Sequence, residues 1–192
     1  MLRKIIVSNI AYSLPNALFS LFFVYLIYYS FHLPPILIGL LTVTSISGRL
    51  IGNKLARITN ITRKSNWILY LIYIIPDFLI GVFLFLTNVQ YLPLIYLVFF
   101  INGILGSVVG YYYSLAKYKL IPKDVYATSS SVISVISSIF DYIFTVVSSI
   151  IISLISYQGA ILMSLILFIG LDTYFVPFFV NVIKSIETDS EK

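Results

Sequence analysis

The chain has 192 residues, of which 60% are hydrophobic and 10% are charged, and its mean hydropathy is +1.03. No soluble domain of this size needs so much apolar side chain, so the composition predicts an integral protein of the lipid bilayer. With no cysteine and one histidine, the sequence excludes disulfides, thiolate metal sites and a histidine-based cluster. We therefore expect neither a bound metal nor a cofactor.

Six apolar stretches, each close to the length that crosses a bilayer, predict six transmembrane helices. In chain order these helices cover about residues 8–30, 36–56, 67–86, 91–115, 127–156 and 160–183, and residues 184–192 form a polar tail. We expect Pro15 to interrupt the first helix and Pro76 to break the third. In the second helix, Gly48 and Gly52 are spaced as GxxxG, which predicts close packing against a neighbouring helix.

The basic residues divide the connections between helices into two sets. All twelve Lys and Arg lie at the N-terminus, in the second-to-third and fourth-to-fifth connections, in the tail, or at Arg49 within the second helix. The other three connections have none. The positive-inside rule therefore places both termini in the cytoplasm, as in a multi-pass protein of the plasma membrane. Because this pattern accounts for the net charge of +5, we expect no nucleic-acid partner.

Three acidic residues lie within the predicted helices: Asp77, Asp141 and Asp172, each near the midpoint of its helix. Asp77 and Asp172 occupy matching places in the third and sixth helices, which favours a chain built from two three-helix repeats of inverted topology. A carboxylate at this depth must be protonated, paired or in contact with water. Each acid is thus a candidate proton or cation coupling group. The alternative is a neutral acid that only hydrogen-bonds a neighbouring helix.

Asp141 shares one face of the fifth helix with a stripe of polar side chains, within roughly 60° of it on a helical wheel. The members of this stripe that we take as candidates for a substrate cavity are Ser134, Ser137, Ser138 and Thr145. The opposite face is apolar and can contact lipid. The stripe makes Asp141 the leading candidate for the coupling group, although serines alone are typical of helix packing.

Three further polar residues lie inside the predicted helices. Arg49 either extends its head group to the cytoplasmic interface or pairs with an acid such as Asp141. Asn16 and Asn102 are candidates for substrate hydrogen bonds at helix breaks, and capped kinks are the alternative. The sequence has no nucleophile–base–acid set, phosphate loop or HExxH motif, so we expect no enzyme.

Three segments resemble the major facilitator superfamily of transporters. Residues 31–41 are similar to the family's turn into its second helix, and residues 102–124 to its fourth helix and the exit from it. Between them, Gly52 and Arg57, followed by Arg63 and Lys64, resemble the family's gating loop, with Ala56 where that loop carries an aspartate. The chain as a whole resembles one six-helix half of such a transporter, the N-terminal half.

The resemblance implies a secondary transporter that works by alternating access. The acids within the helices favour coupling to protons or another cation. The midplane lacks a basic residue apart from Arg49, which favours a small neutral or cationic solute. Family members usually have two six-helix halves, so the resemblance also implies a partner: a second copy in a homodimer or a separate chain. In a homodimer, Asp141 would approach Arg49 of the partner subunit. A non-transporting six-helix membrane scaffold and a truncated remnant of a transporter are the alternatives.

Overall fold

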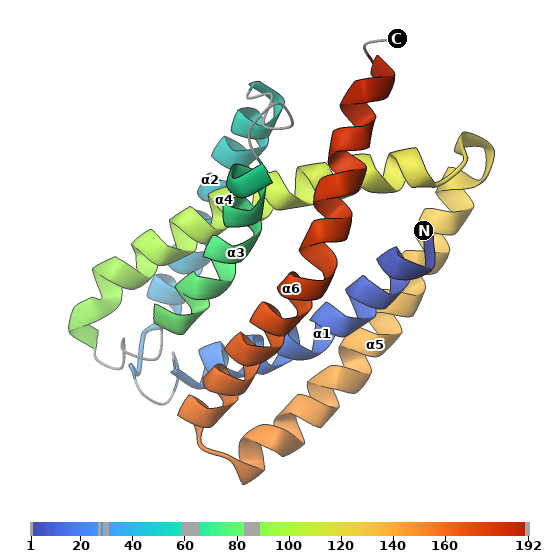
Figure 1. Ribbon diagram of the computed structural model, residues 1–192. Coiled ribbons are helices and arrows are strands. Elements are labelled where there is room, and N and C mark those ends of the chain that lie inside the picture. Colours follow the sequence, from blue (N-terminus) through green and yellow to red (C-terminus); the bar gives the residue numbers. More distant parts are fainter. Residues whose placement is uncertain (1, 27, 29–30, 59–65, 83–88, 191–192) are drawn as a thin grey trace.

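The computed structural model describes residues 2–26, 28, 31–58, 66–82 and 89–190, and its regular elements over these residues are all helical (Figure 1). The six long helices are α1 (Leu2–Tyr25), α2 (Pro35–Ile58), α3 (Asn66–Val82), α4 (Leu92–Leu120), α5 (Tyr126–Leu154) and α6 (Tyr157–Ser190). Two short 3-10 helices, η3 (Val89–Tyr91) and η4 (Lys123–Val125), precede α4 and α5. The prediction of six helices in an all-α chain is therefore confirmed.

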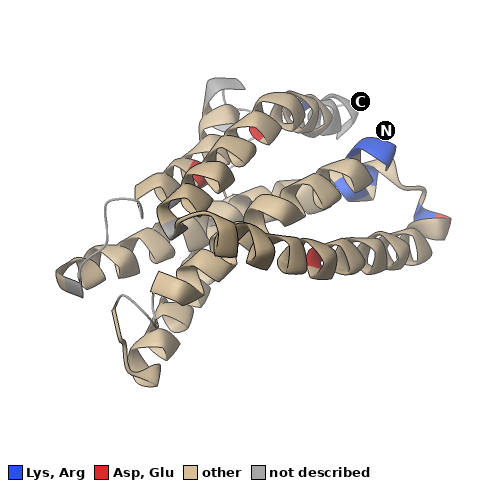
Figure 2. Ribbon diagram, turned by 90° about the horizontal axis from the view of Figure 1, so that it is seen from below, with Lys and Arg blue, Asp and Glu red and all other residues tan. Residues whose placement is uncertain are grey.

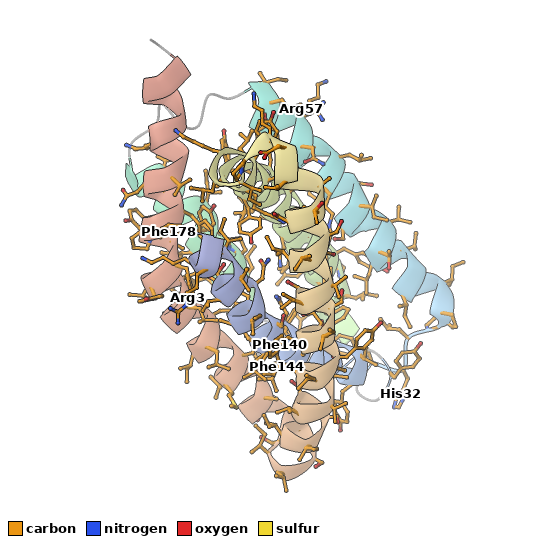
Figure 3. All side chains as sticks on the ribbon, turned by 90° about the vertical axis from the view of Figure 1, so that its right-hand side faces the viewer. Arg3, His32, Arg57, Phe140, Phe144 and Phe178 are labelled. Carbon is orange, nitrogen blue, oxygen red and sulfur yellow. The ribbon has the colours of Figure 1, made fainter. Side chains whose placement is uncertain are left out.

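Five of these helices are long and apolar enough to cross a membrane, and α3 contains a shorter apolar segment, Tyr70–Leu79. An α-helix rises 1.5 Å per residue, so the 17 residues of α3 extend for about 26 Å. Both termini lie toward the same end of the bundle (Figure 2). His32, between α1 and α2, and Arg57, in the last turn of α2, lie at opposite ends (Figure 3).

Two prolines that were expected to interrupt helices lie inside continuous ones. Pro15 is within α1 and Pro76 within α3. Proline removes one backbone hydrogen bond from a helix, but Pro15 is almost fully buried, and the Ser164 hydroxyl donates a hydrogen bond to its carbonyl oxygen (3.0 Å). Packing against α6 therefore keeps α1 helical through the proline.

Two helix ends also differ from the prediction. α1 begins at Leu2 rather than near residue 8, because its first turns pack on α6: Ile5 is fully buried with Phe175 and Phe179, and Lys4 Nζ lies 5.1 Å from the Phe178 ring. α6 continues to Ser190, so most of the expected polar tail is helical. Lys184 and Glu187 are good helix formers and favour the extension.

The most extensive helix pairs are α2 with α4, α1 with α5, α1 with α6, α3 with α6, and α3 with α4. Smaller contacts join α6 to α4 and to α5. As Figure 1 shows, α6 runs between a group formed by α2, α3 and α4 and a group formed by α1 and α5. A Cβ atom on Gly48 or Gly52 would meet the backbone of α4 at Phe100 or Ile104. The close packing predicted from the glycine spacing is thus observed between α2 and α4.

The apolar core is divided along the bundle. One buried cluster includes Phe22, Leu41 and Phe168, and two others are centred on Val176 and Phe175. On α6, Asp172 lies one turn from both Phe168 and Phe175, and it is itself buried. A buried polar layer that contains Asp77 and Asp172 therefore lies between apolar clusters.

Candidate functional site

Two of the three predicted acids meet inside the bundle, where α3 packs against α6. Asp77 is 9% exposed and Asp172 is 6% exposed. Their side chains are within hydrogen-bonding reach of each other. Two ionised carboxylates repel each other, and neither can donate a hydrogen bond. The contact is therefore a hydrogen bond only when one of the two acids carries a proton.

Tyr12 of α1 is the third member of this group. Its hydroxyl donates a hydrogen bond of 2.6 Å to Asp172 Oδ1, and its ring centroid lies 6.2 Å from that of Phe168 and 6.1 Å from that of Phe175. Tyr12 is not among the candidates predicted from the sequence, because tyrosines in apolar helical chains are common anchors at a membrane interface. Its place near the midpoint of α1, away from either end, is the signal that could have singled it out.

Asp77, Asp172 and Tyr12 line a cavity of about 410 Å³, here called the acid cavity. Its other lining residues include Asn9 and Asn16 from α1, Tyr73 from α3, Gly106, Gly110 and Tyr113 from α4, and Phe168 and Phe179 from α6. The Tyr113 hydroxyl donates a hydrogen bond of 2.6 Å to Asn9 Oδ1. Two buried oxygen atoms, Asp172 Oδ2 and Tyr73 Oη, have no hydrogen-bond donor or acceptor of the described chain as partner.

Asp141 lies apart from the other two acids. It is exposed on α5 and lines a second cavity, of about 310 Å³, here called the α5 cavity, with Ser13, Asn16, Ser20 and Thr145. The Thr145 hydroxyl donates to the backbone carbonyl of Asp141 (2.7 Å) rather than to its carboxylate. Of the predicted serine stripe, Ser134 and Ser138 are exposed and Ser137 is half-buried.

The face of α5 toward α1 is also partly aromatic. Phe140 and Phe144 lie on this side (Figure 3), with ring centroids 5.9 Å apart. The carboxylate of Asp141 therefore lies beside apolar surface as well as beside the polar side chains of α1.

Arg49 lies in a third hollow, on the other flank of the molecule. It is exposed on α2 and lines a groove of about 730 Å³, here called the α2–α4 groove, with Asn53, Asn102, Gly106 and Gly110. Arg49 and Asp141 line different hollows, so within one chain the structure does not bring them together. The Ser107 hydroxyl donates to the Arg49 carbonyl oxygen (2.9 Å).

The predicted gating loop is described only in part. Gly52 is buried against α4 and Arg57 is exposed in the last turn of α2. Arg63 and Lys64 lie outside the described residues.

The acid cavity adjoins both of the other hollows. Asn16 lines both the acid cavity and the α5 cavity. Gly106 and Gly110 line both the acid cavity and the α2–α4 groove. The predicted cavity residue Asn16 thus lines the acid cavity, and Asn102 lines the adjoining α2–α4 groove. The described lining of the acid cavity includes none of the polar stripe of α5.

The fold and the site define an all-helical, six-helix protein with long apolar helices and a buried pair of carboxyl groups. No known protein family, curated protein or solved structure matches the chain. Among the described residues, no group of three or more His, Cys, Asp or Glu could hold a metal ion.

Proposed function

We propose that the chain is a multi-pass protein of the plasma membrane with both termini in the cytoplasm. The outer faces of α2 and α5 support this proposal, because they expose large apolar side chains over their whole length, among them Val43 and Leu50 on α2 and Val135, Val146 and Leu154 on α5. Such surfaces are stable in contact with lipid and not with water. The distribution of Lys and Arg along the sequence supports the orientation.

The packing pairs support a fold built from two inverted three-helix repeats. If α1, α2 and α3 exchange places with α4, α5 and α6, the pair α2–α4 becomes α5–α1, the pair α1–α6 becomes α4–α3, and α3–α6 maps onto itself. All five of these most extensive pairs follow the exchange, whereas the smaller contacts of α6 with α4 and with α5 lie outside this pattern. Asp77 and Asp172 meet in the one pair that maps onto itself, as equivalent residues of two repeats would. The proposed architecture is one half of a major facilitator-type transporter.

The function that this geometry supports best is a half-size or split secondary transporter, which couples a small neutral or cationic solute to protons or another cation. The observation that carries it is the buried group of Asp77, Asp172 and Tyr12. A buried acid pair can hold one proton between its members and release it when the cavity opens to water. The pair also lines the acid cavity, which adjoins the α5 cavity and the α2–α4 groove. Helix packing alone would need no such cavity. Asp141 remains a second candidate for the coupling group.

A second six-helix half would complete the proposed transporter, and a second copy of this chain fits that role. Arg49 on α2 and Asp141 on α5 are both exposed and carry opposite charges on the two flanks of one molecule. A two-fold axis along the membrane normal would place each flank against the opposite flank of the partner. Such a homodimer would hold two intersubunit ion pairs.

Alternating access can be tested without knowing the solute, because the chain contains no cysteine. We expect Ser114→Cys, in the α2–α4 groove, to react with an impermeant maleimide from the cytoplasmic side, and Ser20→Cys, in the α5 cavity, from the other side. Between about pH 8 and about pH 5.5, the two labelling rates should change in opposite directions. Asp77→Asn with Asp172→Asn should remove this change.

A six-helix scaffold in which the acids only join helices predicts a different result. Asparagine hydrogen-bonds much as a neutral acid does, so the double asparagine variant would then behave like the wild type. Labelling that is independent of pH in the wild-type background would contradict the transporter proposal and favour the scaffold.

A further inference from the structure

The acid cavity combines negative charge with aromatic walls. Among the described residues that line it, two are acids and none is Lys, Arg or His. Phe179 lies between two tyrosines: its ring stacks on Tyr73 at 6.3 Å and meets Tyr113 edge-on at 5.3 Å. Carboxylates together with aromatic faces are the groups that bind ammonium cations, because the ring quadrupole presents negative charge to the cation.

Two atoms at this cavity lack partners. Asp172 is 94% buried, as 6% is exposed, and its Oδ2 has no hydrogen-bond donor from the described chain. Tyr73 Oη is also buried and has no hydrogen-bond partner from the described chain. Buried polar atoms are almost always hydrogen-bonded. The proton shared with Asp77 can satisfy Asp172 in the unliganded protein, and a bound molecule that supplies positive charge or donors can satisfy both oxygens.

The size and the wall of the acid cavity favour an organic cation over a bare metal ion as its ligand. Its volume of about 410 Å³ lies within the range of ~300–1,000 Å³ that holds small organic ligands. A bare sodium or calcium ion needs several oxygen ligands at short range, whereas much of this wall is aromatic carbon. The wall chemistry therefore favours a cation that carries its own apolar substituents.

We infer that the acid cavity is the binding site for a small organic monocation of the ammonium class, held by Asp77 and Asp172 and packed against the tyrosine and phenylalanine rings. This inference rests on the proposed transport function and identifies its solute class. With one shared proton, the acid pair has one negative charge, which one monocation neutralises. A second proton neutralises it equally well, so the cation and that proton compete for the pair.

Three tyrosines surround the acid pair of Asp77 and Asp172 in the acid cavity. Tyr12 faces it from α1, Tyr73 from α3 and Tyr113 from α4, all three neutral and all lining the cavity. Lys117 Nζ lies 5.8 Å from the centroid of the Tyr113 ring. Asp141 of α5 lies in its own cavity beyond Asn16, and Arg49 of α2 lies in the groove beyond Gly106 and Gly110. Protonation at low pH therefore acts on binding mainly through the acid pair itself.

The acid cavity and the α2–α4 groove share two glycines of α4, and we take this shared wall as the entrance. Gly106 and Gly110 are exposed and line both the acid cavity and the α2–α4 groove. A Cβ on Gly110 would meet no atom within 4 Å, so a larger side chain there fits without displacing a helix. Gly110→Leu should therefore narrow the entrance and leave the fold intact, unlike a substitution at the α2–α4 contact.

Binding can be measured on the full chain in mild detergent with radiolabelled choline, tetraethylammonium and benzyltrimethylammonium as probes. We expect saturable binding of at least one probe at about pH 8, weakened by about tenfold or more at about pH 5.5. 3,3-Dimethyl-1-butanol, which has the shape of choline without its charge, should not displace it. The double variant Asp77→Asn with Asp172→Asn should abolish binding, and Gly110→Leu should slow both association and dissociation.

Two matched controls should bind the probe as the wild type does. Asp124→Asn removes an acid from η4, outside the long helices, and Gly39→Leu adds the same side chain at an exposed glycine of α2 with no atom within 4 Å of its Cβ. The inference is overturned if no probe binds, if the neutral alcohol competes equally, if sodium alone displaces the probe, or if the double asparagine variant still binds. Lack of binding together with pH-dependent cysteine labelling would reject the solute class and leave the transport proposal standing.

Discussion

Tyr12 and Asp172, 160 residues apart in the chain, are joined by a hydrogen bond of 2.6 Å from the tyrosine hydroxyl to Asp172 Oδ1. The bond links α1 to α6 at the depth where Asp172 meets Asp77 of α3. Three helices thus converge on one carboxyl group. A change in its protonation alters the interaction between these helices directly, which is what a proton-coupled change of conformation requires.

The first prediction concerns this hydrogen bond. Tyr12→Phe keeps the ring between Phe168 and Phe175 and removes only the donor, so we expect a loss of about 1–3 kcal/mol in the free energy of unfolding. The lost donor had favoured the ionised acid. The pH midpoint of Ser20→Cys and Ser114→Cys labelling should therefore move upward. Tyr142→Phe, at a tyrosine that is 76% exposed on α5, is the control and should change neither quantity.

The sequence predicted the six helices, but not which acids meet. Periodicity and composition are local, and so is the polar stripe that made Asp141 the leading candidate. The contact of Asp77 with Asp172 depends on how α3 packs against α6, which no single helix encodes. The matching places of Asp77 and Asp172 in their helices were the one sequence feature that indicated a relationship between them. The prediction that Pro15 interrupts its helix was wrong for the same reason. Ser164 of α6 donates a hydrogen bond to the Pro15 carbonyl oxygen, and this contact depends on the packing of α1 against α6.

The second prediction tests the contact between α2 and α4. A Cβ on Gly52 or Gly103 would meet the backbone of the facing helix, so Gly52→Ala and Gly103→Ala should each destabilise the protein by about 1–3 kcal/mol. Gly39→Ala, on the same α2 but with no atom within 4 Å, should be neutral or stabilising by up to about 1 kcal/mol. Thermal unfolding in detergent gives the comparison. Equal stability of all three variants would show that the helices do not approach this closely.

The third prediction tests the proposed orientation. Lys123→Cys, in η4 before α5, and Gln158→Cys, in the first turn of α6, lie at opposite ends of the 29-residue helix α5. In inside-out vesicles an impermeant maleimide should label the first and not the second, and in intact cells the reverse should hold. Because the chain has no native cysteine, unmodified protein is the background control. Labelling of both positions from one side would contradict a membrane-spanning α5.

The last prediction concerns a second copy of the chain. Arg49 and Asp141 lie within about 4 Å of the midpoints of α2 and α5, measured along each axis at 1.5 Å per residue. Opposite charges at similar depth on the two flanks can pair across a two-fold axis. Asp141→Arg or Arg49→Asp alone would place like charges at that interface and should shift the protein from dimer to monomer in light scattering. The double variant should restore the dimer, because it exchanges the charges and keeps both ion pairs. A monomeric wild type, or a double variant that dimerises no better than the single variants, would exclude this homodimer. A separate second-half chain would then be the partner of the proposed transporter.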